Sequence, residues 1–426
     1  MEKDVGIEVY LTATEGLGGR IKAAPEDFIV EEMPSFPPRE ESGTLTVAWI
    51  RTRNWETNRL VRMMSRELRI SRKRIRFAGT KDKRAITTQM FQFDAPLEVV
   101  LGLRLRDVEL LDAYRTSREV DIGDLLGNKF DVVISGIDAG IEDVGDAASA
   151  IQRELTSAGG FPNFFGMQRF GSIRPITHVV GRRITKGDFK GAVDAYVAYP
   201  VEGEGEESFG LRARLEESGD YAEALRTYPD VMSFEKAILN HLVSCPGDYV
   251  GALAQLPFNL LMMFVHGYQS YLFNRMLSER VRRGLPLNEP LEGDVLMPVN
   301  RQGLPDEDRF IPVSPENIEK ARKQASMGAA FVTGILFGSE PVFAEGVMGE
   351  IERRVIETEG LRPEDFTIPA MTRLSSKGTR RALLVPVPKI EILPAEGSLR
   401  MRFQLPKGCY ATAMLREFIK RDNLEA

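Results

Sequence analysis

Short runs in which apolar and polar residues alternate lie near both ends of the chain and predict β-strands there. In SLRMRFQ, for example, Leu399, Met401 and Phe403 fall on one face, and the residues between them are polar. Gly and Pro separate these runs, as turns between strands require. Besides SLRMRFQ at 398–404, strands are predicted for the apolar run RALLVPV at 381–387 and for the β-rich runs at 7–12 (IEVYLT), within 19–33 and within 43–51.

A helical period replaces this alternation from about residue 172 to residue 367. Helices are predicted at 189–199, 221–228, 234–244, 260–283 and 351–359, and EGEGEE at 202–207 is interpreted as a solvated loop. β-rich ends around a helical middle predict an α+β fold in which one domain interrupts another. We expect residues 1–171 and 368–426 to form a discontinuous domain with a mixed or antiparallel sheet. Residues 172–367 are expected to form a mostly helical α+β insertion.

Helices and strands predicted in the first part of the chain show where the unusual loop that contains Asp82 falls in the fold. A helix is predicted at 54–70, with Asn54 or Thr57 as its cap, followed by strands at 75–78, 87–93 and 130–134 and a helix at 141–156. Asp82 falls on the loop between the strands at 75–78 and 87–93. Loops held by a rigid sheet are frequent sites of catalytic residues.

The segment SRKRIRFAGTKDKRAITTQ at 71–89 surrounds that aspartate with bases. Asp82 is its one carboxylate among seven Lys and Arg residues. One interpretation is a solvated loop with a chance aspartate. In the other, the bases hold RNA phosphates and favour the ionised form of Asp82, which acts as a covalent nucleophile. The seven bases are Arg72, Lys73, Arg74, Arg76, Lys81, Lys83 and Arg84.

The composition is that of an ordinary globular protein, with 43% hydrophobic and 28% charged residues. A chain of 426 residues exceeds what one core usually supports, which agrees with two domains. No apolar run approaches the about 20 residues of a membrane span, and the first residues do not resemble a secretory signal. We therefore expect a cytoplasmic protein. Two cysteines and three scattered histidines lack zinc-ligand spacing, so no metal site is predicted.

The charge is distributed unevenly. The net charge of −6 by itself argues mildly against a nucleic-acid-binding protein. Residues 51–84, however, contain thirteen Lys and Arg against three acids, whereas residues 201–221 contain seven acids against two arginines. Because the local field decides where a polyanion binds, RNA remains a good candidate ligand for the basic segment.

Familiar catalytic motifs are absent from the sequence. It contains no G-x-x-x-x-G-K-[ST], H-E-x-x-H or G-x-S-x-G pattern, so NTP hydrolysis, zinc hydrolysis and serine acyl transfer lack support. A single candidate acid and no cofactor motif suit a covalent isomerisation better than hydrolysis, which usually needs two poised groups. GGFPNFFGMQRFG at 159–171 is either a packed interdomain turn or a ligand-facing loop.

Six segments together resemble the TruD family of pseudouridine synthases. PNFFGMQRFG is the most specific of them, and the segments occur in the family's order along much of the chain. The middle region is longer than in bacterial members and is similar to archaeal ones. The segments are Lys22 with PEDF at 25–28, NWETN at 54–58, AGTKDKRAITTQ at 78–89, GNKF at 127–130, PNFFGMQRFG at 162–171 and FQLPKGCYATAMLRE at 403–417.

This resemblance implies a fold, a reaction and a set of site residues. The discontinuous domain would be a pseudouridine synthase catalytic domain, and the insertion a TRUD domain. The enzyme would isomerise a uridine of tRNA, at position 13, without a cofactor or metal. Asp82 would be the nucleophile, Lys22 its partner, Asn128 a contact of the site and Phe130 the residue that stacks on the target base. Further predicted substrate-binding residues are Gln168, Arg169, Lys81, Lys83, Arg84 and Arg76.

Two other classes of function are compatible with a basic, RNA-binding chain. A tRNA-binding or chaperone protein would fold RNA without modifying it, but would need no catalytic aspartate. A methyltransferase or deaminase would need a G-x-G cofactor loop or zinc ligands, which the sequence lacks. The expected partner is therefore tRNA, with no membrane and no protein partner implied.

Overall fold

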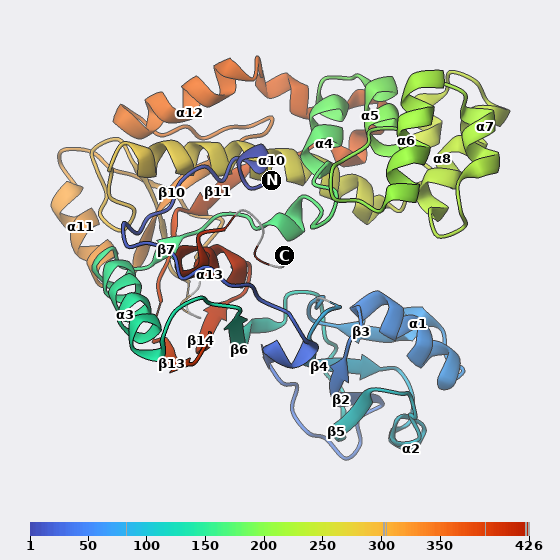
Figure 1. Cartoon of the computed structure of the whole chain (residues 1–426), viewed down its shortest axis with the longest axis horizontal. Coiled ribbons are helices and arrows are strands. Elements are labelled where there is room, and N and C mark those ends of the chain that lie inside the picture. The colour runs from blue at the N-terminus through green and yellow to red at the C-terminus, as the bar shows by residue number, and fades with distance from the viewer. Residues whose placement is uncertain (82, 301–302, 304, 388, 422–423, 425–426) are drawn as a thin grey trace. The chain divides into compact units, whose positions relative to one another are not determined.

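The structure is a computed structural model that describes residues 1–81, 83–300, 303, 305–387, 389–421 and 424 (Figure 1). It divides into two compact units, described separately below. The first contains Met1–Tyr10 and Pro162–Val385, and the second contains Leu11–Phe161 and Pro386–Ala426. All of residues 172–367, the predicted insertion, belong to the first unit. That unit also takes in the flanking segments 1–10, 162–171 and 368–385.

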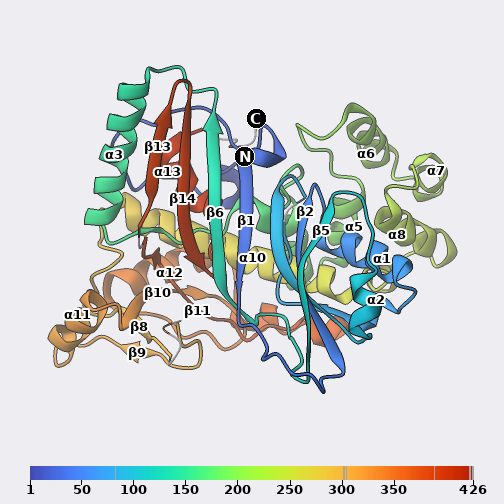
Figure 2. The same ribbon diagram turned by 90° about the horizontal axis from the view of Figure 1, so that it is seen from below.

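The second unit is built on a mixed sheet of eight strands (Figure 2). The β1–β4 pair is parallel, and its other pairs are antiparallel. The α+β class with a mixed sheet is thereby confirmed. In spatial order the strands are β13 (Glu391–Ala395), β14 (Ser398–Pro406), β6 (Leu125–Ser135), β1 (Phe28–Pro34), β4 (Ile86–Phe93), β2 (Leu45–Arg53) and β5 (Val108–Thr116), while β3 (Ile75–Phe77) pairs with β4.

Helices cover parts of this sheet. Leu60, Val61 and Met64 of α1 (Thr57–Glu67) are buried in one core with residues of β2 and β4. The helix begins after Glu56, whose carboxylate accepts from the N–H groups of Asn58 and Arg59. The predicted cap, Asn54 or Thr57, was therefore wrong. The other helices of this unit are α2 (Leu97–Leu101), α3 (Ile141–Ser157), α13 (Ala411–Ile419) and the short η2 (Pro25–Asp27) and η3 (Arg72–Arg74).

The predicted strand at 7–12 is not a strand. The backbone N–H of Glu8 donates to Ser278 Oγ, and those of Leu11 and Thr12 donate to the carboxylate of Glu417. Ile7 and Thr12 are buried and the residues between them are half-buried, but the backbone N–H groups named above bind side chains instead of a neighbouring strand. EGEGEE is also only partly a loop, because α6 (Glu206–Ser218) begins inside it.

The first unit is organised around α10 (Phe258–Arg282), which contacts α4 (Thr177–Thr185), α12 (Gly346–Thr358) and β10 (Ala330–Leu336) (Figure 1). α4 and α10 approach closely at Gly181, where a Cβ would meet Phe264 O at 2.0 Å. Asn274 of α10 bonds to Val5 O and to the backbone of Phe165, which joins the two flanking segments to this unit.

The remaining elements of the first unit are a small sheet and shorter helices. The sheet has the order β11 (Thr379–Ala382), β10, β8 (Val295–Pro298) and β9 (Ile311–Pro312). None of the helices formed by described residues combines the length and the hydrophobicity that a membrane span requires. The other elements are η1 (Lys3–Val5), β7 (Phe161–Pro162, across the junction of the units), η4 (Met167–Arg169), α5 (Phe189–Val197), α7 (Tyr221–Thr227), α8 (Ser233–Ser244), α9 (Tyr249–Leu253), α11 (Ile318–Ser326), η5 (Pro363–Phe366), η6 (Pro369–Leu374) and β12 (Leu384–Val385).

Candidate active site

Three of the predicted site residues lie on one face of the sheet in the second unit. The β1–β6 register places Asn128 opposite Glu32 and Phe130 opposite Val30. Side chains alternate between the faces of a strand, so Phe28, Val30 and Glu32 share one face of β1 with Asn128 and Phe130 beside them. α1 covers the β2–β4 part of this same face.

Lys22 lies against this face. Its side chain is buried, and its Nζ lies 4.7 Å from the ring centroid of Phe28. The Phe28 ring in turn meets the ring of Phe130 edge to face, with centroids 6.1 Å apart. The backbone of Lys22 is in the left-handed region, with φ of 58°, a conformation that costs a non-glycine residue energy and is concentrated at functional sites.

Phe130 is half-buried and stacks on Phe403 of β14, with ring centroids 5.1 Å apart and an angle of 17° between the rings. The pairing of β6 with β14 sets these two residues directly opposite each other. The aromatic group predicted to stack on a base is therefore held by two neighbouring aromatic rings, Phe28 and Phe403, that restrict its orientation.

Asn128 has a buried side-chain oxygen, Oδ1, with no hydrogen-bond partner among the described residues. A buried acceptor without a donor costs about 1–3 kcal/mol, so a ligand that donates to it would recover that energy. The preceding residue, Gly127, allows the close approach of β6 to β14 that fixes the position of Asn128. A Cβ at Gly127 would lie 2.1 Å from Leu405 O, so only glycine lets β6 approach β14 this closely.

The loop before β4 is anchored by a buried ion pair that the sequence did not reveal. Lys81 Nζ lies 2.8 Å from Glu32 Oε1, and both side chains are almost fully buried. Glu32 Oε2 also accepts from the backbone N–H of Met90. The available signal was the strand FIVEEMP, in which Glu32 falls in phase with the inward-facing Phe28 and Val30.

Two polar side chains hold the same loop. Thr57 Oγ1 at the start of α1 accepts from Lys81 N at 2.8 Å, and Gln89 Nε2 donates to Gly79 O at 3.2 Å. The loop is thus fixed to the sheet face up to Lys81. Asp82, the predicted nucleophile, lies outside the described residues.

The other predicted bases are placed differently from one another. Lys83 and Arg84 are exposed, and Arg84 Nη2 lies 3.5 Å from Ala23 O, beside Lys22. Arg76 lies on the opposite face of the sheet, because it pairs with Gln92 of β4, and its guanidinium is 2.8 Å from Glu119 Oε1. Arg84 therefore lies beside the site, with Lys83 preceding it in the chain, whereas Arg76 lies on the opposite face of the sheet.

Gln168 and Arg169 lie in the first unit, in the short helix η4. Arg169 Nε donates to Ser270 Oγ at 3.2 Å, and its guanidinium lies 5.7 Å from the ring centroid of Phe165. The structure therefore groups Lys22, Asn128, Phe130, Lys81, Lys83 and Arg84 in one unit and Gln168 and Arg169 in the other.

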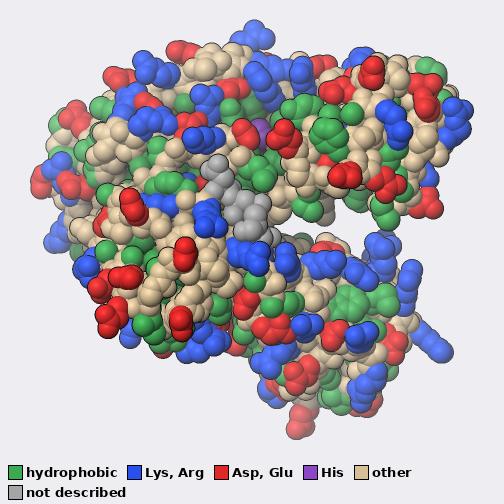
Figure 3. All heavy atoms as spheres, viewed as in Figure 1, with side chains coloured by type: hydrophobic (Ala, Val, Ile, Leu, Met, Phe, Trp, Pro, Cys, Tyr) green, Lys and Arg blue, Asp and Glu red, His purple; other side chains and the backbone are tan. Residues whose placement is uncertain are grey.

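Lys and Arg side chains gather over α1 and β3 in the space-filling view (Figure 3). Within the basic segment 51–84, some cations are paired with acids, such as Arg53 with Glu26 and Arg74 with Asp94. Others are exposed on or beside α1 and have no ion pair within the described part of the chain. These exposed cations are Arg59, Arg62, Arg66, Arg69, Arg72 and Lys73.

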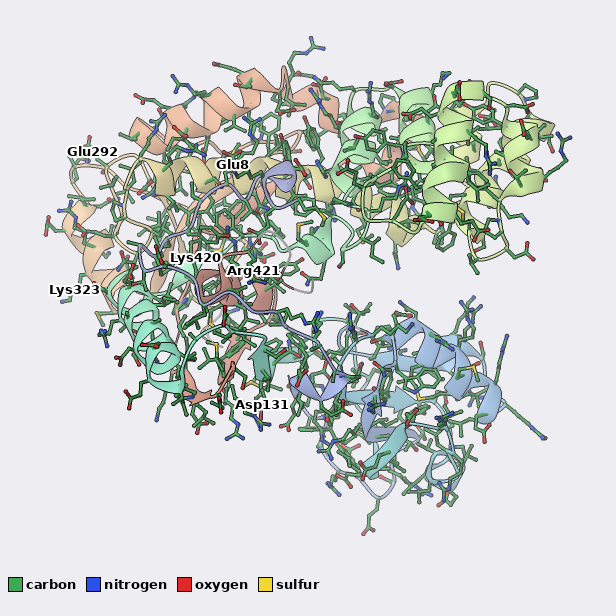
Figure 4. The ribbon with its side chains drawn as sticks, in the orientation of Figure 1. Glu8, Asp131, Glu292, Lys323, Lys420 and Arg421 are labelled. Carbon is green, nitrogen blue, oxygen red and sulfur yellow. The ribbon has the colours of Figure 1, made fainter. Side chains whose placement is uncertain are left out.

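Asp131 projects from the other face of β6 and ties that strand to β14 (Figure 4). Its carboxylate accepts from Arg400 Nε at 2.6 Å, Arg400 Nη2 at 2.9 Å and Arg402 Nε at 3.0 Å. These bonds lie one position from the Phe130–Phe403 pair. The clamp therefore supports the register that places the aromatic stack.

We expect Asp131→Asn to lower the free energy of unfolding by about 1 kcal/mol at pH 7. Burial acts to raise the pKa of Asp131, but the hydrogen bonds and charges of Arg400 and Arg402 outweigh burial and lower the pKa. A carboxyl with a lowered folded-state pKa stabilises the fold above its unfolded pKa of about 3.9, and this stabilisation is lost as the pH falls through the folded pKa. Urea unfolding should show a difference between the two proteins at pH 7 that shrinks below about pH 4; an equal difference at both pH values would contradict the clamp.

Comparison with known proteins places the chain in a family. A family model described as "tRNA pseudouridine synthase D (TruD)" matches residues 4–418. The chain is 41% identical over 432 residues to the probable tRNA pseudouridine synthase D of Methanosarcina mazei, an alignment that covers 100% of this chain and 98% of the relative. It is 42% identical over 434 residues to the corresponding protein of Methanococcoides burtonii, with coverage of 100% and 98%. The chain belongs to the tRNA pseudouridine synthase D family.

The fold agrees with this family. The crystal structure of a putative tRNA pseudouridine synthase D from Methanosarcina mazei matches this one with a TM-score of 0.85 at 41% identity, covering 100% of this chain and 98% of that chain. The resemblance inferred from the six segments is thereby confirmed, together with the enzyme class. Among the described residues of this TruD family member, no three His, Cys, Asp or Glu side chains are grouped as metal ligands.

Proposed function

We propose that this protein isomerises uridine to pseudouridine in tRNA. The observation that carries the proposal is the convergence of Lys22, Asn128 and Phe130 on one face of the central sheet, each within a segment that resembles the family. A protein that only bound or folded tRNA, the alternative function, would need neither a buried lysine nor an unpaired amide oxygen beside an aromatic ring.

The proposed reaction starts from Asp82, whose carboxylate attacks the nucleoside or removes a sugar proton. The N1–C1′ bond breaks, the uracil turns, and C5 bonds to C1′. C5 then loses a proton and N1 gains one, so the product is an isomer and Asp82 is released. Lys22 is the proposed partner of Asp82, because a nearby ammonium favours the ionised carboxylate.

The target uridine must leave its stack to reach such a site. We propose that Phe130 stacks on the uracil and that Asn128 Oδ1 accepts a hydrogen bond from the N3–H of the base. Lys83 and Arg84 are proposed to contact the flanking phosphates. With its ammonium held by Glu32, Lys81 is proposed to position the loop, and the phosphate contacts predicted for Lys81 and Arg76 stay predictions.

We also propose a role for each domain, a target uridine and a location for the protein. Residues 1–171 and 368–426 are proposed as the catalytic domain, and residues 172–367 as the insertion that contributes to tRNA binding. The exposed cations around α1 supply phosphate neutralisation. The proposed target is uridine 13 of tRNA, and the proposed location is the cytoplasm.

The test is to map pseudouridine in unmodified tRNA before and after incubation with the purified protein. We expect one new pseudouridine at position 13. New pseudouridine at another position would refute the proposed position but support the activity, whereas tRNA that stays unmodified would support the binding-protein alternative.

We expect both Phe130→Ala and Phe130→Leu to lower turnover roughly ten- to a hundredfold, because base stacking on an aromatic ring is worth about 1–3 kcal/mol and leucine cannot replace it. Single-turnover assays would measure both variants. A matched control is Phe36→Ala, which removes an exposed ring that packs on Trp49. Near-normal activity of the leucine variant would show that Phe130 only fills space.

A further inference from the structure

A cavity of about 200 Å³ lies within the first unit, at the side of α10 that faces η4 and β11. α10 contributes three of its lining residues at helical spacing, so their side chains share one face. Its polar lining consists of Arg169, His266, Gln269, Ser270, Ser376 and Thr379.

Hydrogen bonds fix several of these groups in place. Ser270 Oγ donates to His266 O at 2.7 Å and accepts from Arg169 Nε at 3.2 Å. Gln269 Nε2 donates to Phe337 O at 2.7 Å and to Ser376 Oγ at 3.0 Å. The polar wall of the cavity is therefore preorganised, which reduces the entropy lost when a ligand binds.

The cavity presents donors without an acid to neutralise them. Within the described part of the chain, the two terminal nitrogens of Arg169 and the ring nitrogens of His266 have no hydrogen-bond partner. None of the described lining residues is Asp or Glu. Burial and the nearby Arg169 lower the pKa of His266, so one ring N–H remains as a donor at neutral pH. This combination favours an anion.

The size of the cavity limits the ligand to one chemical group, and its aromatic lining argues against a stacked base. Pockets for complete small molecules span about 300–1,000 Å³, so this cavity suits one group of a larger ligand. Phe165, its aromatic lining residue, has Arg381 at 4.0 Å and Arg169 at 5.7 Å from its ring centroid. Because guanidinium groups already cover this ring, a phosphate fits the cavity better than a nucleobase.

We propose that this cavity is a phosphate-binding site in which Arg169, His266 and Thr379 hold one backbone phosphodiester of the tRNA. The inference rests on the proposed function for its ligand and adds His266, Ser270, Ser376 and Thr379 to the substrate-binding residues. The same chemistry would bind free inorganic phosphate, so the two sources must be separated by experiment.

Histidine NMR provides the direct test, since the chain contains three histidines and His266→Gln identifies the His266 signal. Unmodified tRNA is expected to raise the pKa of His266 by about one or more, because an opposite charge within about 4–6 Å favours the protonated ring. His241, which is half-buried beside Asp248 and does not line the cavity, should be unaffected. A His266 pKa that tRNA leaves unchanged overturns the proposal. If inorganic phosphate shifts the pKa of His266 and tRNA does not, the proposal is also overturned, and the cavity is a site for free anions.

tRNA affinity gives a second, independent test. Arg169→Gln is expected to reduce the slope of log Kd against log salt by roughly one, as for the loss of one phosphate contact. Thr379→Val should weaken binding severalfold with little change in that slope. Arg353→Gln is the matched control, because Arg353 lies 5.3 Å over the Phe343 ring but does not line the cavity. An unchanged slope for a folded Arg169→Gln protein overturns the proposal.

The proposed function and the proposed phosphate site can be refuted independently of each other. If the unaltered protein forms no pseudouridine, the proposed function fails whatever the cavity binds. If it forms pseudouridine while His266 and the salt slope do not respond, only the phosphate site is refuted.

Discussion

Replacing Asp82 by asparagine is expected to lower pseudouridine formation by about 10⁴-fold or more, the scale of loss when an enzyme's nucleophile is removed. Asparagine keeps the shape of aspartate but cannot attack carbon or accept a sugar proton. We therefore expect tRNA affinity within about tenfold of the unaltered protein, since binding depends mainly on phosphate neutralisation by other residues. The measurements are a single-turnover assay and a tRNA titration.

Asp94→Asn is the matched control for this experiment. Asp94 belongs to the same unit and pairs with Arg74 on the surface, at 3.1 Å, so its loss should leave turnover unchanged. Substantial turnover by the Asp82 variant would remove Asp82 from the proposed mechanism. Lost turnover with equally lost affinity would instead indicate that Asp82 supports binding.

Lys81→Met is expected to cost about 3–5 kcal/mol of unfolding free energy, the usual result of leaving one partner of a buried ion pair without the other. Glu32 would be left charged, with side-chain exposure of 0%. The double variant Lys81→Met/Glu32→Gln should recover most of this loss, because it removes both charges and keeps an acceptor for Met90 N. Denaturant unfolding of the single and double variants measures the coupling.

The adjacent residue offers a control of the same type. Glu31 pairs with Lys129 at 2.8 Å, the same separation as the Lys81–Glu32 pair, but both side chains are about half exposed. Lys129→Met should therefore cost less than about 1 kcal/mol. Equal losses of unfolding free energy in the two lysine variants would show that burial does not increase the contribution of the Lys81–Glu32 pair to stability.

The sequence predicted local elements and motif positions well, because both depend on residues near one another in the chain. The helix predicted at 141–156 is α3, and the longest predicted helix, at 260–283, is α10. Lys22, Asn128 and Phe130 were named from short motifs. The β1–β6 pairing puts Asn128 and Phe130 on one sheet face, whereas the position of Lys22 is set by its contact with the Phe28 ring.

Long-range partners could not be predicted in the same way. The stacking of Phe403 on Phe130 depends on the register of two strands far apart in the sequence. The sequence did not show that the side chain of Lys81 is buried against Glu32, because surface lysines and buried ones look alike in a sequence. Only the alternation of β1 indicates that Glu32 points inward, and a carboxylate at such a position requires a cation beside it.

The sheet of the second unit also has a consequence for synthesis on the ribosome. β6 ends at Ser135, but β14, its neighbour, begins only at Ser398. At about 5–20 residues per second, β14 emerges roughly ten seconds to a minute after β6. Until then β6 has an open edge available for wrong pairing, and Asp131 lacks both of its arginines. The sheet of the second unit is therefore completed only after β14 has emerged, and a chain that ends before residue 398 cannot complete it.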